Sequence, residues 1–392
     1  MNEDEVNADR AQSERAASTR LKVMTILGTR PEIIRLSACL KRCDEVFDHV
    51  LVHTGQNYDY ALNQVFFEEL GLRPPDHYLN CVGQNLGESL GNILAKSFAV
   101  LEAERPDALL ILGDTNSALS AIVAKRLKIP IFHMEAGNRC WDWNVPEMIN
   151  RKIVDHISDI NLPYTEHARR YLLSEGLDGK TIFVTGSPMR EVLEAHLPKI
   201  RERDILDRLG LTPRRYFLVS AHREENIDHE GHFLSLMTAI NEVAARHGLP
   251  VLYSAHPRTQ KFIQARGFRF HPNVVLHAPL GFLDYVKLQM ESQCVLSDSG
   301  TLSEESAILG FCGVLIRTST ERPEALDAGS VVMGGIDPAH VLQAIDLAVA
   351  LRSAEAAWRI PPDYAETNVS AKVVRIIQSY ADVVRKTVWN QF

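Results

Sequence analysis

The stretch Leu21–Gly28, LKVMTILG, gives the clearest indication of the fold class of this chain. This short run, rich in β-favouring apolar residues, is followed by PEIIRLSACLKRC at 31–43, in which apolar residues recur with helical spacing. An apolar run that ends at a glycine before a helix-period segment is typical of a strand, a tight turn and a helix. The stretch therefore predicts a β-strand that leads directly into an α-helix.

The same strand-to-helix pattern recurs in both halves of the chain. In the first half it returns at 49–55 (HVLVHTG), 108–114 (ALLILGD), 129–137 (IPIFHMEAG), 159–164 (DINLPY) and 181–188 (TIFVTGSP). In the second half it returns at 216–223 (YFLVSAHR), 249–258 (LPVLYSAHPR), 273–280 (NVVLHAPL), 294–300 (CVLSDSG) and 313–319 (GVLIRTS). Alternating strands and helices form right-handed βαβ units around a parallel sheet. We predict an α/β protein of two Rossmann-like, doubly wound parallel-sheet domains that face a central cleft, where such folds bind ligands.

The length of 392 residues supports two domains, because it exceeds what one hydrophobic core usually holds. Residues 1–20 mix both charge signs with Ala, Ser and Asn, which predicts a disordered tail. We expect an N-terminal domain at 21–187, a linker near 187–207 and a C-terminal domain at 188–370. Residues 371–392 are expected to form a helix that packs back on the N-terminal domain.

Composition argues against several classes of protein. A net charge of −8 disfavours general nucleic-acid binding, which needs clustered Lys and Arg. No uninterrupted apolar run approaches the ~18–20 residues that cross a bilayer, so no membrane insertion is expected. The six cysteines form no C-x-x-C pair and no secretory signal precedes them, which favours the cytoplasm. His229 and His232 lack the spacing of zinc ligands, so no metal site is predicted.

The turn GTRPE that begins at Gly28 has two interpretations. Thr29 and Glu32 are spaced as a capping box, so the turn can simply start a well-capped helix. Gly28 also lets a ligand approach the backbone, and Arg30 and Arg35 place guanidiniums beside free helix N–H groups, a combination suited to a pyrophosphate. We favour the anion site. Since the chain has no G-x-G-x-x-G or Walker A loop, no nicotinamide or ATP cofactor is indicated.

Carboxylates gather where neighbouring strands of the first predicted sheet end. Asp114 follows ALLILG and Glu135 follows IPIFHM, which places both at one edge of the sheet. Asp114 can instead merely cap the next helix. Downstream, Glu147 opens an unusually polar helix that also carries Arg151, and the alternative for this helix is a solvated face.

The second half offers groups of another kind at its strand ends. His222 and His256 each follow an apolar strand and come just before an Arg, which suggests two facing ligand groups. Small residues at Ser299–Thr301 form a strand-to-helix turn that would let helix N–H groups reach phosphate oxygens. Thr301 and Glu304 again have capping-box spacing.

Taken in order, these motifs resemble the non-hydrolysing UDP-N-acetylglucosamine 2-epimerases. The resemblance rests on GTRPE at Gly28, GDT at Gly113, HMEAG at His133, PE at Pro146, SAHREEN at Ser220, SDSG at Ser297 and TERPEA at Thr320, and it spans nearly all of 21–347. Within this family, LVHTGQNYDY, GNRC and RTSTERPEALD are similar to the UDP-N-acetyl-L-fucosamine synthases of capsule and O-antigen assembly.

The resemblance implies a fold shared with one large class of glycosyltransferases, usually as a homodimer. It also implies C2 epimerisation of a UDP-N-acetylamino sugar without metal or cofactor: UDP is eliminated to leave a 2-acetamidoglycal and is re-added with protonation from the other face. The branch implies conversion of UDP-2-acetamido-2,6-dideoxy-L-talose to UDP-N-acetyl-L-fucosamine. UDP-N-acetylglucosamine and a diacetamido-uronate sugar are the alternative substrates.

Carried over by motif, the acid–base group consists of Asp114, Glu135, Glu147 and His222, with no assignment to a face of C2. Tyr285 falls at the uracil position and Glu305 at the ribose position. The implied substrate contacts are Arg30, Arg35, Arg151, His256, Tyr285, Ser299, Gly300, Thr301, Glu305 and Arg322.

Two residues and one segment depart from the family pattern. Arg35 stands where the family usually has Lys, and Met148 stands where it generally has a second Glu. The region associated with allosteric activation is replaced by Gln56–Asp59, so that control is not expected here.

Three rival functions use similar residues. A glycosyltransferase on the same fold would bind a nucleotide sugar alike, and a catalytically silent binding protein is kept open by Met148. A nicotinamide-dependent epimerase is weaker, because no strand is followed by the glycine fingerprint.

Overall fold

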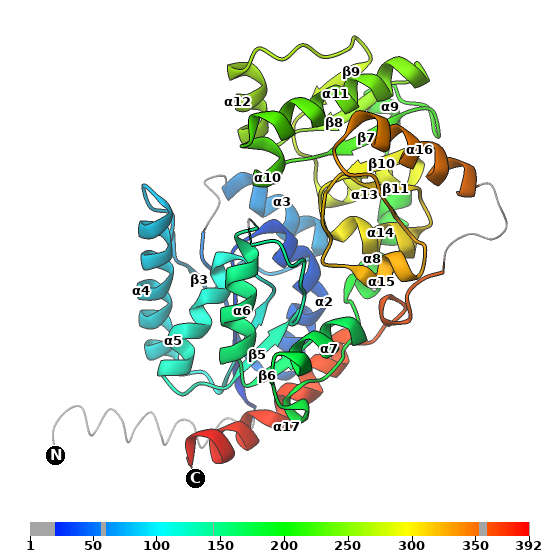
Figure 1. Ribbon diagram of the computed structural model, residues 1–392. Helices are drawn as coiled ribbons and strands as arrows, with labels where there is room; N and C mark the ends of the chain where they lie inside the picture. The colour runs from blue at the N-terminus through cyan, green and yellow to red at the C-terminus, as the bar shows by residue number, and fades with distance from the viewer. Residues whose placement is uncertain (1–19, 56–59, 144, 353–358, 392) are drawn as a thin grey trace.

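Two six-stranded parallel sheets of the same topology form the framework of the protein (Figure 1). The computed structural model describes residues 20–55, 60–143, 145–352 and 359–391, with only the backbone at 60–63. Apart from Arg20, the expected disordered tail lies outside the described residues, as do all of Gln56–Asp59.

The first sheet has the strand order 3-2-1-4-5-6. The second repeats this order when its strands are counted from β7, so the prediction of two doubly wound α/β sheets is confirmed. In spatial order, the first sheet contains β3 (His77–Tyr78), β2 (Asp48–His53), β1 (Lys22–Leu27), β4 (Ala108–Leu112), β5 (Ile131–Met134) and β6 (Ile160–Leu162). The second contains β12 (Val332–Met333), β11 (Gly313–Leu315), β10 (Cys294–Ser297), β7 (Phe217–Ser220), β8 (Val251–Ser254) and β9 (Val274–His277).

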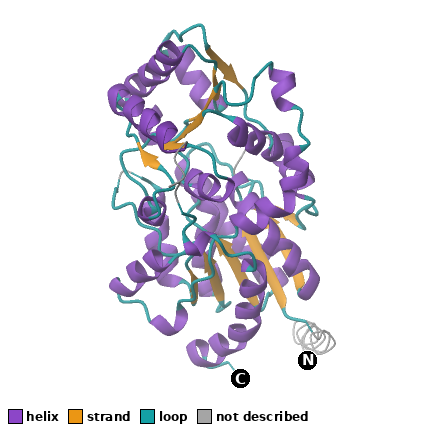
Figure 2. Cartoon of the chain, turned by 90° about the vertical axis from the view of Figure 1, so that its right-hand side faces the viewer, coloured by secondary structure: helices purple, strands orange, loops and turns teal. Residues whose placement is uncertain are grey.

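Helices flank both sheets, as Figure 2 shows for the lower sheet. Central strands are therefore buried on both faces: every residue of β4 is buried, and its sequence is an unbroken apolar run. The helices of the first half are α2 (Arg30–Val46), α3 (Tyr60–Leu70), α4 (Leu86–Glu104), α5 (Ser120–Arg126), α6 (Glu147–Ile157) and α7 (Glu166–Ser174). Those that follow are α8 (Met189–Arg201), α9 (Ile205–Leu209), α10 (Glu224–Ile227), α11 (Glu230–His247), α12 (Pro257–Ala265), α13 (Phe282–Glu291), α14 (Thr301–Leu309), α15 (Pro323–Asp327), α16 (Pro338–Arg352) and α17 (Val369–Trp389). Short 3-10 turns lie at Asn116–Leu119, Gly179–Thr181 and Pro362–Tyr364.

One predicted strand is wrong. The segment 181–188 forms a single bridge, between Ile182 and Asn161, and then turns through Gly186 into α8. Phe183 of this segment packs against α17, since its ring centroid lies 4.8 Å from that of Tyr380. The two-residue strands β3 and β12 were not expected from the sequence.

The hydrophobic core around the first sheet draws on distant parts of the chain. Leu36 of α2 shares this cluster with Val192 of α8, Val286 of α13 and Val373 of α17. Helix α17, red in Figure 1, thus returns to the N-terminal half. The exact domain boundaries remain predictions.

Within the described part of the chain, no helix combines the length and apolarity needed to span a bilayer.

Candidate active site

The sheet order brings the polar residues predicted from the sequence to facing strand ends. Strands β1, β4 and β5 are neighbours in the first sheet, so the turns that follow them carry Arg30, Asp114 and Glu135 side by side. Strands β8, β7 and β10 are neighbours in the second sheet, and they end at His256, His222 and the turn before α14. Near these turns, ion pairs connect the two halves: Arg322 Nη2 lies 2.8 Å from Glu135 Oε1, and Arg151 Nη2 lies 4.0 Å from Glu321 Oε1.

Glu135 lies in a strained backbone conformation and is held by two guanidiniums. Its φ is 61°, in the left-handed region that a residue with a side chain rarely adopts and that tends to mark functional sites. Oε1 accepts hydrogen bonds from Arg322 Nη2 at 2.8 Å and Asn138 Nδ2 at 3.2 Å, and Oε2 accepts one from Arg35 Nη1. Arg35 therefore pairs with a carboxylate here, and its contact with a diphosphate remains a prediction.

Arg322 is the centre of the buried ion network. Its Nη2 also lies 3.4 Å from Oε2 of Glu304, whose other oxygen accepts a hydrogen bond from the Ser187 hydroxyl. Its guanidinium stacks 5.7 Å from the ring of Tyr164. Although the side chain is fully buried, Nε and Nη1 find no hydrogen-bond partner among the described residues. Unpaired buried donors are costly unless an acceptor such as an anion arrives.

Asp114 and Glu147 meet beside a third arginine. Arg151 Nε donates to Asp114 Oδ2 at 2.6 Å, so Asp114 is an ion-pair partner and not a helix cap. Burial, and then the nearby charge of Asp114, raise the pKa of Glu147 above its usual value, while Arg223 and Arg151 oppose that shift. Two neighbouring carboxyls with unequal surroundings can hold and release protons at neutral pH.

Met148, which replaces the family's second Glu, faces the same arginine. Its sulfur lies 3.7 Å from Arg151 Nη1, and Cys140 Sγ lies 3.9 Å from that atom. Met148 is fully buried in a small cluster with Cys140 and Val145. The thioether of Met148 thus lies where a carboxylate could form an ion pair with the Arg151 guanidinium.

Glu321 is a site residue that sequence reasoning did not select. Oε2 accepts a hydrogen bond from Arg317 Nη1 at 2.7 Å, and Oε1 lies 3.6 Å from Arg223 Nη2. Burial alone would raise the pKa of Glu321, but Arg317, Arg223, Arg151 and Arg322 lower it well below its usual value. Its only sequence signal is the Arg-Pro-Glu that repeats the first turn.

The two predicted histidines face each other. The ring centroids of His222 and His256 lie 6.4 Å apart, and the main-chain N–H of His222 donates to buried Asp298 at 2.8 Å. Burial, and then the positive charge of Arg30 from the first half, lower the pKa of His256 to about 4. His256 is therefore neutral near pH 7 and Arg30 lies close to it.

The turn before α14 leaves its helix N-terminus without a side-chain cap. Gly300, not Thr301, is the N-cap, and Glu304 instead binds Ser187 and Arg322, so the capping box expected there is wrong. The hydroxyls of Ser299 and Thr301 lie 2.9 Å apart at this open end. The N–H groups of Leu302 and Ser303 donate to the carbonyls of Ser299 and Gly300 at 3.2 and 3.3 Å. A helix start without a side-chain cap is in general suited to an anion.

Glu305 and Tyr285 lie next to this turn. Gln289 Nε2 donates to Glu305 Oε2 at 2.6 Å, and burial raises the pKa of Glu305 to about 7. Burial, followed by the charge of Glu305, also raises the pKa of Tyr285. The residues expected at the uracil and ribose positions are therefore neighbours.

The capping box expected at Thr29 is only partly formed. Helix α2 does begin after Thr29, but that hydroxyl caps no helix N–H; it donates to Glu32 Oε2 at 2.8 Å. Glu32 also accepts from the N–H of Gly28 at 3.1 Å and from the Ser117 hydroxyl at 2.5 Å. This buried carboxyl joins the turn after β1 to the turn after β4.

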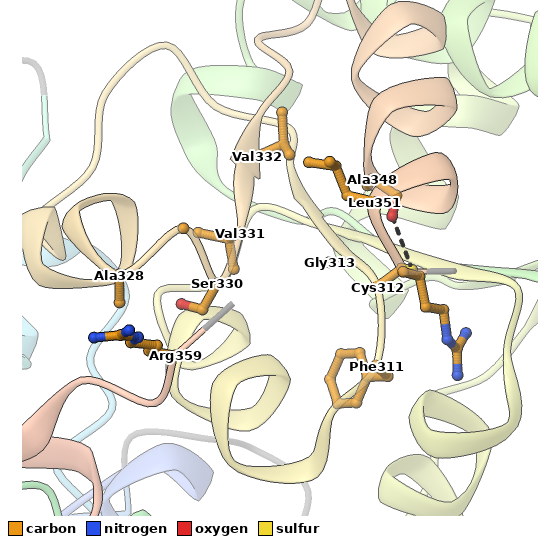
Figure 3. Close-up of a pocket in the computed structure, with 12 residues that line it drawn as sticks. Phe311, Cys312, Gly313, Ala328, Ser330, Val331, Val332, Ala348, Leu351 and Arg359 are labelled. Atoms are coloured by element: carbon orange, nitrogen blue, oxygen red, sulfur yellow. Dashed lines mark hydrogen bonds between the residues drawn. The ribbon is translucent and has the colours of Figure 1, made fainter. Parts of the chain in front are cut away.

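A hollow of about 380 Å³ lies away from these residues, beside β11, β12 and α16 (Figure 3). Val331, Leu351 and Phe311 line it together with Arg359. Among the described residues, no group of three or more His, Cys, Asp or Glu side chains is arranged to hold a metal ion.

Comparison with known proteins identifies close relatives. A family model described as UDP-N-acetylglucosamine 2-epimerase matches residues 41–378. The solved UDP-N-acetylglucosamine 2-epimerase of Rickettsia bellii is 46% identical, with 95% of this chain and 100% of that chain covered and a TM-score of 0.88. The UDP-GlcNAc 2-epimerase of Methanocaldococcus jannaschii, solved in complex with UDP-GlcNAc and UDP, is 32% identical, with coverages of 92% and 100% and a TM-score of 0.86.

Two further proteins bear on substrate and fold. A UDP-2,3-diacetamido-2,3-dideoxy-D-glucuronate 2-epimerase of Pseudomonas aeruginosa is 33% identical over 319 residues, 80% of this chain and 88% of that one. A glycosyltransferase of Rickettsia africae covers 95% of this chain and 100% of its own with a TM-score of 0.54. Because it is only 10% identical, it shows the shared glycosyltransferase-B-like fold alone.

Proposed function

Because the chain belongs to the UDP-N-acetylglucosamine 2-epimerase family, we propose that it inverts C2 of UDP-N-acetylglucosamine (UDP-GlcNAc). It is a non-hydrolysing UDP-sugar 2-epimerase, an isomerase. The substrate proposal is supported by three relatives that are named as UDP-GlcNAc 2-epimerases. A fourth, at 33% identity, is named as a diacetamido-glucuronate 2-epimerase, and none of the four is named as a fucosamine synthase.

The C2 hydrogen of such a sugar is not adjacent to a carbonyl, so its direct removal is slow. Elimination breaks the C1–O bond and the C2–H bond together, UDP leaves with the bonding electrons, and a 2-acetamidoglycal remains. Re-addition of UDP at C1 with protonation of C2 from the opposite face gives the epimer. This route needs a proton acceptor, a proton donor and cations at the leaving diphosphate.

The observation that carries this proposal is the group of Asp114, Glu147 and Arg151 at the strand ends: Arg151 donates to Asp114, and the charges of both act on Glu147. Burial and the charge of Asp114 raise the pKa of Glu147, which favours the protonated form of this carboxyl. We assign acid–base roles to these two residues together with Glu135 and His222, without choosing a face for each.

The nucleotide is proposed to bind at the second sheet. Arg30 and neutral His256 lie together, and the uncapped start of α14 presents N–H groups beside Ser299 and Thr301, which suits a diphosphate. We place the ribose at Glu305 and the uracil near Tyr285. Arg322, with two unpaired buried N–H groups, would stabilise charge near the sugar or the phosphates.

The pair UDP-2-acetamido-2,6-dideoxy-L-talose and UDP-N-acetyl-L-fucosamine is a second candidate. One observation favours it: the GNRC segment that resembles the fucosamine branch contacts the acid–base group, since Asn138 donates to Glu135 and Cys140 lies beside Arg151. Roles in capsule or O-antigen assembly depend on this candidate.

A homodimer and a cytoplasmic location also remain proposals. Exposed apolar side chains of Ile149 and Ile153 on α6, with Trp141 in the preceding loop, support an association of two copies. Light scattering coupled to gel filtration would give twice the monomer mass for a dimer and the monomer mass otherwise.

The reaction is tested by incubating the protein in D2O with UDP-GlcNAc, and separately with the L-talo sugar and the diacetamido-uronate sugar, while NMR follows the C2 proton. Deuterium at C2 of an epimerised product supports elimination and re-addition and identifies the substrate. Glu147→Gln is the matched control, which should lose exchange but still bind UDP. If none of the sugars exchanges, the epimerase reaction fails for these substrates, and UDP release with acceptors would then favour a glycosyltransferase.

A further inference from the structure

Glu321 is a buried carboxylate in the site to which the reaction above gives no role. It lies just before α15 in the second half, and 4% of its side chain is exposed. Besides Arg317, it faces Arg223 Nη2 at 3.6 Å and Arg151 Nη2 at 4.0 Å. Arg151 belongs to α6 of the first half, and Arg223 to the turn after β7 of the second. One negative charge thus faces arginines from both halves.

The approach of Glu321 depends on Gly300. A Cβ built at residue 300 would collide with the Glu321 carboxylate oxygen, so any larger residue there would push the carboxylate away. Glycine is needed here for close approach and not for its backbone angles, because φ at Gly300 is −62°. The Glu321 carboxylate therefore packs against the same turn that we propose to bind the diphosphate.

Of the two arginines facing Glu321, Arg151 contacts an acid–base carboxyl and Arg223 acts on another through its charge. Arg151 donates to Asp114 through Nε at 2.6 Å. Arg223 is held by Asp298, and its charge acts on Glu147. Without Glu321 both guanidiniums would lose one of their nearby negative charges, and removing one partner of a buried ion pair is strongly destabilising.

We propose that Glu321 is a positioning residue of the epimerase: its charge fixes Arg151 and Arg223, and through them sets Asp114 and Glu147 against the sugar. The inference rests on the proposed function. Glu321 itself need not touch the substrate. It lies where charged side chains of the two halves meet, with Arg151 of the first half 4.0 Å from its carboxylate.

The test compares Glu321→Gln, which keeps shape without charge, with Glu321→Asp, which keeps charge on a shorter side chain. The control is Glu225→Gln, because Glu225 is also a partly buried partner of Arg223, at 3.4 Å, but does not face Arg151. Each full-length variant is assayed for the kcat and KM of C2 exchange with UDP-GlcNAc, and for UDP affinity by calorimetry.

Glu321→Gln is expected to lower kcat by about 10²-fold, the scale of a misplaced catalytic group. UDP should bind as tightly as before or more tightly, because a negative charge beside the proposed diphosphate turn is removed. Glu321→Asp should recover part of kcat, and Glu225→Gln should stay within about threefold of the unaltered protein. If Glu321→Gln does not fold, a lower kcat with unchanged UDP affinity in Glu321→Asp carries the same support.

Two results would overturn the inference: a kcat for Glu321→Gln no lower than that of Glu225→Gln, or a parallel fall of kcat and UDP affinity, which is the mark of a structural role only. Absence of exchange in the unaltered protein is a different outcome. It removes the proposed function, and the inference with it.

Discussion

Arg322 Nη2 lies 2.8 Å from Glu135 Oε1, and this contact joins a residue after the second sheet's β11 to the end of β5 in the first sheet. Both side chains are almost fully buried, and the same Nη2 lies 3.4 Å from Glu304 Oε2. The two halves are therefore joined by charge at the point where their strand ends face each other. Loss of this buried arginine would leave two buried carboxylates without their shared cation and should lower the free energy of unfolding.

Arg322→Ala should lower the free energy of unfolding by about 3–5 kcal/mol, because it leaves Glu135 and Glu304 buried without their shared cation. Urea denaturation measures this loss. Arg42→Ala is the control, since Arg42 and Glu45 form an exposed pair expected to contribute less than about 1 kcal/mol. Equal losses in the two variants would show that the interdomain pair does not stabilise the fold.

The sequence predicted the central strands well, because in a doubly wound sheet they are buried runs that end at a turn. β1 before Gly28 and β4 before Asp114 follow this rule. The rule failed at the edges. β3 and β12 are two residues long, too short for a pattern. The segment 181–188 lies along the sheet edge with one bridge and two main-chain hydrogen bonds but forms no full strand, and its Phe183 packs on α17.

Some site residues, such as Glu147 and Tyr285, were predicted from a polar helix or from the family resemblance, and others because they follow a strand. Asp114, Glu135, His222 and His256 all do, and the topology brings them together. Glu321 could not be selected in this way, because its importance comes from arginines 98 and 170 residues away in the chain, Arg223 and Arg151. Contacts between residues so far apart in the chain produce no short sequence motif, so sequence analysis cannot detect them.

The raised pKa of Glu305 predicts that the free energy of unfolding depends on pH. Its folded pKa of about 7 lies above the usual glutamate value of 4.5, so the protonated form is favoured by folding. The stability that this group contributes is full below pH 4.5 and is lost as the pH rises through 7. Glu305→Gln should therefore gain about 3 kcal/mol relative to the unaltered protein between pH 4.5 and pH 8.

Chemical denaturation across this pH range checks the prediction. Glu45→Gln is a suitable control, because Glu45 is exposed and its removal should leave the pH profile of stability unchanged. A Glu305→Gln curve parallel to that of the unaltered protein would mean that Glu305 ionises normally in the folded state.

Arg223→Gln tests the electrostatics of Glu147. Burial and Asp114 raise the pKa of Glu147, and Arg223 is the foremost charge that lowers it. Removing this cation should move the limb of the pH–rate profile that reports Glu147 to higher pH, whichever limb it is. Arg223→Lys should keep the limb near its original place, and a shift to lower pH in Arg223→Gln would contradict the assignment of that limb to Glu147.

Met148→Glu asks what the missing second carboxylate would do. Met148 Sδ lies 3.7 Å from Arg151 Nη1, so a carboxylate introduced there would pair with the guanidinium that also holds Asp114. Arg151 would then share its charge with one more anion, leaving Asp114 less tightly held and a more reactive proton acceptor. We expect kcat for C2 exchange to rise on the order of tenfold, which corresponds to about 1.4 kcal/mol in the activation barrier.

The control is Met148→Gln, which has nearly the same shape as Met148→Glu without the charge and should not reproduce the gain in kcat. A fall in kcat for Met148→Glu beyond that of Met148→Gln would mean that the thioether suits this chain's own arrangement of Arg151 and Glu321, and that the departure from the family pattern is compensated and not a defect.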